Sequence, residues 1–292
     1  VIPISGAKNA ALPLMAASLL SAKPLTLYNI PDLADIKTMR SLLAQHGIEQ
    51  HAFSHNGATA LTLQGPVITS TTAPYELVRT MRASVLVLGP LLARCGQARV
   101  SMPGGCAIGT RPVDLHLSGL EKMGAKISLE RGYIEAQAPS NGLQGAFITL
   151  PHVSVGATEN LMMAAVLAAG ETVLQGAARE PEVTDLARCL KAMGASIEGA
   201  GTDTITIQGV QSLNEAAHTV IPDRIETGTY MIAAAITGGE LTLTRCEPAH
   251  LLSFTACLRE TGARVTVNGD TICVNGEQPL TGIDVMTEPH PG

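Results

Sequence analysis

The 292-residue sequence contains no tryptophan, and aromatic residues make up only 2% of it. Hydrophobic residues nevertheless account for 46%, so a sizeable core must be built from alanine, leucine, valine, isoleucine and methionine. Few aromatic rings are then available to stack on bases or sugars. There is no long basic run, and the formal net charge is −6. Both observations argue against nucleic acid or an anionic membrane surface as a partner.

Metal-binding and targeting signals are also missing. The six cysteines form no CxxC pair and no zinc-spaced cluster with histidine. We therefore expect reduced, mostly buried thiols and neither a metal nor another cofactor. The longest apolar stretch, residues 161–169, has about half the length of a membrane span. The N-terminus lacks methionine and any signal-like segment, and its pattern is that of the middle of a strand, so we expect a fragment of a soluble cytoplasmic protein.

An internal repeat dominates the organisation of the chain. Each copy predicts an alternating strand, a turn with proline or acidic residues, an amphipathic helix, a glycine C-cap and a further strand. The copies occupy residues 25–48, 171–197 and 240–265, and the end of another occupies 117–129. Alanine-rich helices are predicted ahead of them at 9–20, 84–94, 159–168 and 227–236. The helix starts recur about every seventy residues, which predicts a duplicated α/β scaffold of βαβαββ units.

The segment with the most functional signals is residues 101–116, SMPGGCAIGTRPVDLH. Its prolines and glycines predict a loop with free backbone amides. Cys106 stands five residues before Arg111. A nearby guanidinium and glycine amides would both lower the pKa of the Cys106 thiol, which would make it reactive. A loop thiol without a function is the alternative.

Two further segments indicate anion binding. Lys8 and Asn9 stand where a strand enters a helix, and the amides at a helix start favour an anion. A solvated lysine beside an asparagine cap fits the same pattern. Arg82 stands at the start of an apolar helix, where its charge opposes the helix dipole and needs an anionic partner. That partner is either a ligand or a structural ion-pair residue such as Glu76.

Two other helix starts favour structural roles. Residues 223–226, Asp-Arg-Ile-Glu, indicate an ion-paired turn. Residues 155–160 predict a helix start with Thr158 as its cap.

Four segments together resemble the UDP-N-acetylglucosamine enolpyruvyl transferase family. They are SGAKNAALP at 5–13, MRASVLVLGPLLAR at 81–94, PGGCAIGTRPVDLH at 103–116 and PDRIETGTY at 222–230. The resemblance extends over the whole chain. It implies the enolpyruvyl transferase fold, an α/β fold in which two domains each hold three βαβαββ units around a pseudo-threefold axis. Residues 8–221 would form one complete domain. Residues 1–7 with 222–292 would form part of the other, with about two units missing.

The resemblance also implies a reaction. The family transfers the enolpyruvyl group of phosphoenolpyruvate to the 3-hydroxyl of UDP-N-acetylglucosamine and releases phosphate. Cys106 matches the family's catalytic acid, which can also form an adduct with phosphoenolpyruvate. Lys8, Asn9 and Arg111 match residues that bind phosphoenolpyruvate. The positions implied to bind the nucleotide sugar are Arg82, Arg111, Pro112, Val113, Asp114, Leu115, His152, Val153, Ser154 and Val155.

Two departures from the family pattern matter. His152 stands where the family often has lysine, and a neutral histidine donates a hydrogen bond without bringing a fixed charge. The family's proton acceptor, and the arginines that bind the carboxylate of phosphoenolpyruvate, would follow Gly292. Residues 1–292 alone are therefore expected to be inactive.

Two alternatives compete with this assignment. The shikimate-pathway enolpyruvyl transferase has the same fold, but it has no cysteine on this loop and binds no nucleotide. A non-enzymatic paralogue would be favoured by loss of Cys106, Lys8 or Arg111, and all three are present.

Overall fold

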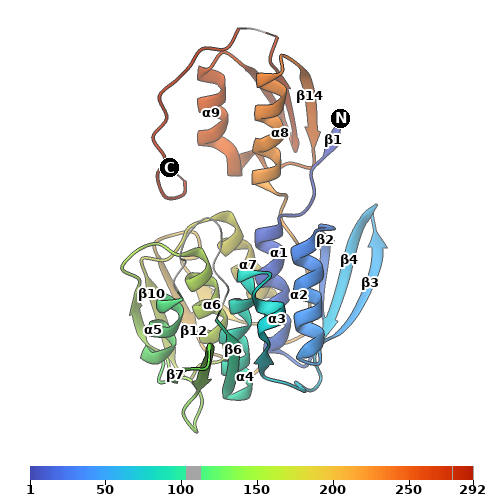
Figure 1. Ribbon diagram of the computed structural model, residues 1–292. Coiled ribbons are helices and arrows are strands. Elements are labelled where there is room, and N and C mark those ends of the chain that lie inside the picture. The colour runs from blue at the N-terminus through green and yellow to red at the C-terminus, as the bar shows by residue number, and fades with distance from the viewer. Residues whose placement is uncertain (103–112, 278, 292) are drawn as a thin grey trace.

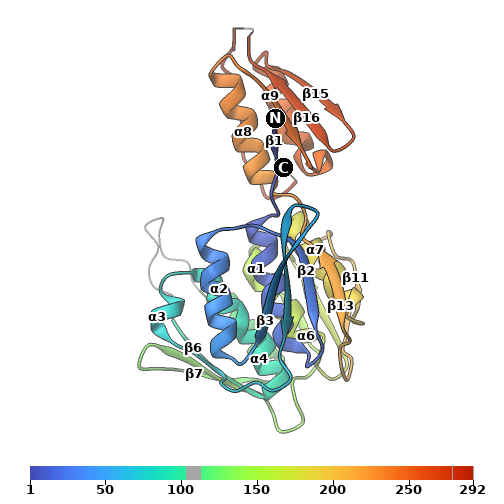
Figure 2. The ribbon, with the colours of Figure 1, turned by 90° about the vertical axis from the view of Figure 1, so that its right-hand side faces the viewer.

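The computed structural model describes residues 1–102, 113–277 and 279–291, and their elements gather in two units (Figure 1). Over these residues, one hydrophobic cluster draws its buried members from residues 7–220, and a second draws them from Ile4 and residues 231–274. We call residues 7–221 the first unit, and residues 1–6 with 222–291 the second unit. Figure 2 shows the second unit above the first, with the N-terminal strand reaching up into it.

One pattern of strand pairing recurs in the four sheets of the described residues. An outer strand pairs in parallel with its neighbour, and the two remaining pairings are antiparallel. The first unit holds the sheets β13-β2-β4-β3 (Ala216–Thr219, Leu25–Ile30, Ala58–Gln64, Glu49–His55), β5-β6-β8-β7 (Thr72–Ala73, Gln97–Ser101, Tyr133–Gln137, Lys126–Glu130) and β9-β10-β12-β11 (Phe147–Thr149, Glu171–Gln175, Thr204–Gln208, Ser196–Glu198). The second unit holds β1-β14-β16-β15 (Ile2–Pro3, Glu240–Thr244, Thr271–Asn275, Arg264–Asn268). The predicted βαβαββ repeat is confirmed.

The two units exchange their opening strands. β1 stands directly before the first helix of the first unit, yet it pairs with β14 of the second unit, with Ile2 beside Leu243. β13 stands directly before the first long helix of the second unit, yet it pairs with β2 of the first unit, with Ala216 beside Leu25. Each unit therefore completes a sheet with a strand that is remote in sequence from the strand beside it.

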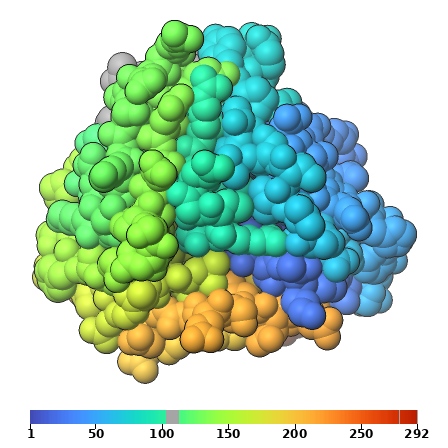
Figure 3. All heavy atoms as spheres, turned by 90° about the horizontal axis from the view of Figure 1, so that it is seen from below, coloured from blue at the N-terminus to red at the C-terminus, as the bar shows by residue number. Residues whose placement is uncertain are grey.

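The alanine-rich helices of the first unit lie at its centre. The inner helices are α1 (Lys8–Ala17), α4 (Leu88–Cys95) and α6 (Val155–Ala165), and α1 and α6 are buried over most of their length. The remaining helices are α2 (Ala34–Gln45), α3 (Tyr75–Val78), α5 (Asp114–Lys122), α7 (Pro181–Ala192), α8 (Arg224–Ile236) and α9 (Leu252–Glu260), with 3-10 turns η1 (Ser18–Leu20), η2 (Arg82–Val87) and η3 (Pro248–Leu251). Seen from the end opposite the second unit, early, middle and late residues of the first unit occupy separate sectors (Figure 3).

Two glycines allow α6 to lie close to its neighbours. A Cβ atom at Gly89 on α4 would lie 2.5 Å from the backbone oxygen of Asn160, and one at Gly119 on α5 would lie 2.5 Å from the side chain of Leu161. A close-packed interior cannot absorb such an overlap without shifting the helices. Both glycines therefore fix the positions of α4 and α5 against α6.

Several predicted helix boundaries are wrong. The helix expected from residue 227 begins at Arg224, and the helix expected from residue 84 begins at Leu88, after the 3-10 turn η2. The helix expected from residue 159 begins at Val155, and its cap is Ser154, whose hydroxyl accepts a hydrogen bond from the Ala157 amide at 3.3 Å. Thr158 lies within the first turn, where its hydroxyl donates to the Ser154 carbonyl at 2.8 Å and accepts from the Ala178 amide at 3.0 Å. Serine is at least as good a cap as threonine, and Ser154 stands four residues before the predicted cap Thr158. The loop expected over residues 101–116 ends earlier, because α5 starts at Asp114, whose carboxylate suits a helix N-terminus.

Within the described ranges, no helix has the length and apolar character needed to cross a membrane.

Candidate active site

A pocket of about 580 Å³ opens where the first unit meets the second. The starts of α1, α6, α7, α8 and η2 contribute to its lining or stand directly beside it. It brings together residues that the sequence placed in one site although they are far apart in the chain. These are Lys8, Asn9, Arg82, Ser154 and Val155.

The other predicted site residues of the described ranges lie outside this lining. Val113 and Leu115 are buried in the hydrophobic cluster of the first unit. Asp114, His152 and Val153 are exposed. The predicted residues Cys106, Arg111 and Pro112 lie outside the described residues. The structure therefore assembles one part of the predicted site.

Lys8 is the first residue of α1, and its ammonium group forms an ion pair with Asp35 at 2.9 Å. Both side chains keep about a third of their surface exposed, 39% for Lys8 and 34% for Asp35. The N-cap residue of α1, Ala7, makes no side-chain hydrogen bond, and no acidic residue lies in the first turn, but the Asp223 carboxylate accepts a hydrogen bond from the Lys8 amide at 3.4 Å. The dipole of α1 and the charge of Lys8 both favour anionic groups here, and the carboxylates of Asp223 and Asp35 are the anionic partners among the described residues.

Arg82 opens η2 on the neighbouring side of the pocket. Glu76, which the sequence offered as a structural partner for it, forms an ion pair with Arg79 at 2.9 Å. The start of α6, with Ser154, Val155 and Gly156, lines the same pocket. The pocket lining thus combines the cationic side chains of Lys8 and Arg82 with the starts of α1 and α6. Such a set suits phosphate groups.

His116 on α5 was not predicted as a site residue, although it lines the pocket. Its side chain is buried, and its Nδ1 lies 2.9 Å from the side-chain nitrogen Nδ2 of Asn160. The Asn160 oxygen accepts a hydrogen bond from the Gly89 amide at 2.8 Å, and this orients the Asn160 NH₂ group toward His116. Nδ1 is therefore the acceptor, and the neutral ring carries its proton on Nε2. Burial lowers the pKa of His116 most, and the charge of Arg82 lowers it further. The charge of Asp114 raises it by less, so the pKa is about 4.

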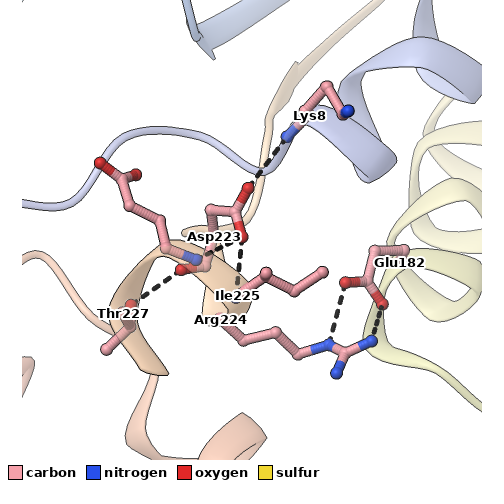
Figure 4. A network of polar contacts seen from close by, with 7 residues as sticks. Lys8, Glu182, Asp223, Arg224, Ile225 and Thr227 are labelled. Atoms are coloured by element: carbon pink, nitrogen blue, oxygen red, sulfur yellow. Dashed lines mark hydrogen bonds and ion pairs between the residues drawn. The ribbon is translucent and has the colours of Figure 1, made fainter. Parts of the chain in front are cut away.

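The lining of the pocket also includes acidic residues, which the sequence analysis missed. Glu159 on α6 is buried, and Glu180 and Glu182 lie at the start of α7. Burial, and then the charges of Glu182 and Glu180, raise the pKa of Glu159 well above its usual value, which favours its neutral form. Arg224, the first residue of α8, contacts Glu182 here (Figure 4). Among the described residues, no cluster of three or more histidine, cysteine, aspartate or glutamate side chains is placed to hold a metal.

Comparison with known proteins identifies the family. The family model described as EPSP synthase (3-phosphoshikimate 1-carboxyvinyltransferase) matches residues 1–292. UDP-N-acetylglucosamine 1-carboxyvinyltransferase from Rhodospirillum centenum is 61% identical over the whole chain, which covers 69% of that relative. The enzyme of the same name from Acidiphilium cryptum is 59% identical with the same coverage. The chain belongs to the UDP-N-acetylglucosamine 1-carboxyvinyltransferase family.

Solved structures of carboxyvinyltransferases share the fold. The enolpyruvyl transferase NikO from Streptomyces tendae superposes with a TM-score of 0.81 at 25% identity, over 96% of this chain and 66% of that one. EPSP synthase from Acinetobacter baumannii gives a TM-score of 0.72 at 21% identity, over 97% of this chain and 65% of that one. The family and the enolpyruvyl transferase fold that the sequence predicted are both confirmed.

The burial of His116 predicts how the stability of this carboxyvinyltransferase chain depends on pH. The pKa of His116 is about 4 in the folded chain and about 6.5 when unfolded, so the unfolded chain binds an extra proton between these values. Stability should therefore fall as the pH drops from about 6.5 to 4, by up to about 3 kcal/mol from this group. Urea unfolding across this range measures the slope. His116→Gln should flatten it, and equal slopes for both proteins would contradict the prediction.

Proposed function

We propose that this chain provides the nucleotide-sugar site and most of the phosphoenolpyruvate site of a UDP-N-acetylglucosamine 1-carboxyvinyltransferase, which acts in the first committed step of peptidoglycan precursor synthesis. The observation that carries the proposal is the 61% identity over the whole chain to a relative of that name. The cationic side chains of the pocket lining agree with it, because both substrates carry phosphate groups.

The proposed reaction moves a three-carbon enol group between oxygens. A proton adds to C3 of phosphoenolpyruvate, and C2 becomes an oxocarbenium-like centre. The 3-hydroxyl of the sugar attacks C2 and gives up its own proton. Loss of phosphate from C2 and of a proton from C3 restores the double bond. The step therefore needs an acid near C3, a proton acceptor for the hydroxyl and cations around the phosphate.

We assign these roles by the family pattern. Cys106 is the proposed acid, and Lys8 and Arg111 the cations at the phosphate, with Asn9 beside them. Arg82 and residues 111–115 are proposed to contact the nucleotide sugar. Lys8, Asn9 and Arg82 support this division, since they line one pocket at helix starts. Val113 and Leu115 are buried in the core, so we expect them to contact the sugar nucleotide mainly through backbone atoms.

The segment before α6 is proposed to bind the nucleotide sugar as well. Ser154 and Val155 line the pocket, whereas His152 and Val153 are exposed at its approach. As a neutral donor, His152 can bond an oxygen of the uridine or of the diphosphate. Two further assignments belong to the proposal. Residues 8–221 form one domain and residues 1–7 with 222–292 part of another, and the protein works in the cytoplasm without nucleic-acid or membrane partners.

Ligand choice tests the proposed function. UDP-N-acetylglucosamine should raise the melting temperature of the chain, because a ligand that binds only the folded state stabilises it by mass action. Shikimate 3-phosphate should leave the melting temperature unchanged. In the intact protein, phosphate release should require phosphoenolpyruvate and UDP-N-acetylglucosamine together. Stabilisation by shikimate 3-phosphate alone would instead support the shikimate-pathway reaction.

A further inference from the structure

The first turn of α8 joins the two units through side chains (Figure 4). Arg224 donates to Glu182 of α7 twice, from Nε to Oε1 at 2.9 Å and from Nη2 to Oε2 at 3.3 Å. Asp223 caps α8 by accepting from the amides of Ile225 and Glu226 at 2.8 and 3.0 Å. Its second oxygen lies 3.4 Å from the amide of Lys8, at the start of α1. The start of α8 is therefore held against two helices of the first unit.

The ion pair differs from an ordinary surface pair because it is largely removed from water. The Glu182 side chain is 4% exposed and that of Arg224 26%. Glu159 lies close enough to Glu182 and Glu180 for their charges to raise its pKa. One carboxylate oxygen of each, Glu159 Oε1 and Glu180 Oε2, is buried without a hydrogen-bond partner in the described part of the structure. Arg224 thus supplies positive charge to a desolvated acidic site, and its removal would leave buried negative charge uncompensated.

Two chain segments connect the units next to the Arg224–Glu182 ion pair. These segments cross side by side, with the Ala7 amide bonded to the Ile221 carbonyl at 2.8 Å and the Asp223 amide bonded to the Ser5 carbonyl at 2.9 Å. Gly6 and Pro222 form an isolated bridge between them. A pair of strands this short resists bending weakly, so it acts as a hinge whose angle must be set by contacts beside it.

We propose that Arg224 and Glu182 form a latch that holds the second unit at one angle over the pocket. The latch lies beside the hinge and is bidentate, so it opposes rotation about the crossing segments as well as separation of the units. The surrounding carboxyl groups strengthen it, because opening would expose Glu182 to them without its counter-charge. The latch consists of contacts between the two units, so this proposal does not depend on the proposed reaction.

The distance between the units tests the latch. A keto-bearing amino acid placed at Ser54 on β3 and at Thr266 on β15 allows spin labelling without touching the cysteines, since both positions are exposed on strands. Double electron–electron resonance should give one narrow distance distribution for the parent chain. Arg224→Gln should add a second distance or make the distribution about twice as wide. A distribution equal to that of the parent would overturn the latch.

Matched variants separate the latch from a general loss of structure. The double exchange Glu182→Arg with Arg224→Glu should restore the narrow distribution that either single exchange broadens, and failure to restore it would also count against a specific pair. Glu135→Gln serves as the control, because it removes the Arg99 ion pair, which lies between β6 and β8 within one sheet, and should leave the distance unchanged. If Arg224→Gln does not fold, Arg224→Lys replaces it. Lysine keeps the charge but cannot reproduce the planar two-point contact, so broadening is still expected, and a parent-like distribution would overturn the proposal.

Discussion

Cys106→Ser is expected to abolish covalent labelling by fosfomycin, the epoxide antibiotic that alkylates the loop thiol of this family, and to reduce turnover sharply in the intact protein. A hydroxyl is a much weaker nucleophile than a thiolate and a poorer acid than a thiol. Mass spectrometry of the intact chain and its peptides detects the adduct. Cys106→Asp should retain activity while escaping the label, because a carboxyl group can donate the proton but offers no sulfur to alkylate.

The other cysteines provide the control for this prediction. Burial raises the pKa of the thiols of Cys95 and Cys246, and raises that of Cys189 to about 12, so little thiolate forms at these positions near neutral pH. The Cys95→Ser variant should be labelled by fosfomycin to the same extent as the parent chain. An adduct mapped to Cys95, Cys189 or Cys257 instead of Cys106 would show that the proposed acid is wrongly assigned.

Lys8→Ala should weaken phosphoenolpyruvate binding far more than it weakens the fold. Deleting a cation that contacts a bound phosphate in a desolvated site costs about 2–5 kcal/mol, roughly thirty-fold to several-thousand-fold in affinity. In the folded chain the same side chain forms a half-exposed ion pair with Asp35, and such pairs contribute little to stability. Titration of phosphoenolpyruvate in the presence of UDP-N-acetylglucosamine measures the affinity, and thermal unfolding measures the stability.

Lys37→Ala is the matched control for Lys8→Ala. Lys37 also pairs with an aspartate, Asp32 at 2.8 Å, but both side chains are exposed and neither lines the pocket. Its replacement should leave the phosphoenolpyruvate affinity and the melting temperature near the parent values. If Lys8→Ala lowered the melting temperature and the affinity in proportion, the role of the lysine would be structural and its assignment to the phosphoenolpyruvate site would be wrong.

The sequence predicted the scaffold well because the signals for it are local. Alternating strands, glycine caps and alanine-rich helices repeat every seventy residues or so, and the inner position of α1 and α6 follows from their small side chains. Helix starts were predicted less well. At α6 the sequence predicted Thr158 as the cap, but Ser154, four residues earlier, is the cap, and Thr158 instead accepts a hydrogen bond from the Ala178 amide.

The cluster of glutamates in the pocket lining could not be predicted, because the burial and proximity of these side chains depend on tertiary structure. Glu159 looks like a helix-surface glutamate in the sequence, and only the position of α6 beneath α7 buries it near Glu180 and Glu182. His116 offered a weak signal, since it ends the conspicuous segment 101–116. Its fixed tautomer, however, depends on Asn160 and Gly89, which are remote in sequence. Residues at a local helix start, such as Lys8, were accessible to sequence reasoning, and residues whose surroundings come from remote parts of the chain were not.

The pairing of β1 with β14 has a consequence for the order in which the protein folds during synthesis. Ile2 leaves the ribosome about 240 residues before its partner Leu243. At typical elongation rates of about 5–20 residues per second, the first strand therefore waits on the order of tens of seconds without its partner. Residues 7–221 can meanwhile form all three of their sheets, since β13 closes the last of them. A chaperone that binds this waiting strand should thus delay the second unit while leaving the first free to fold.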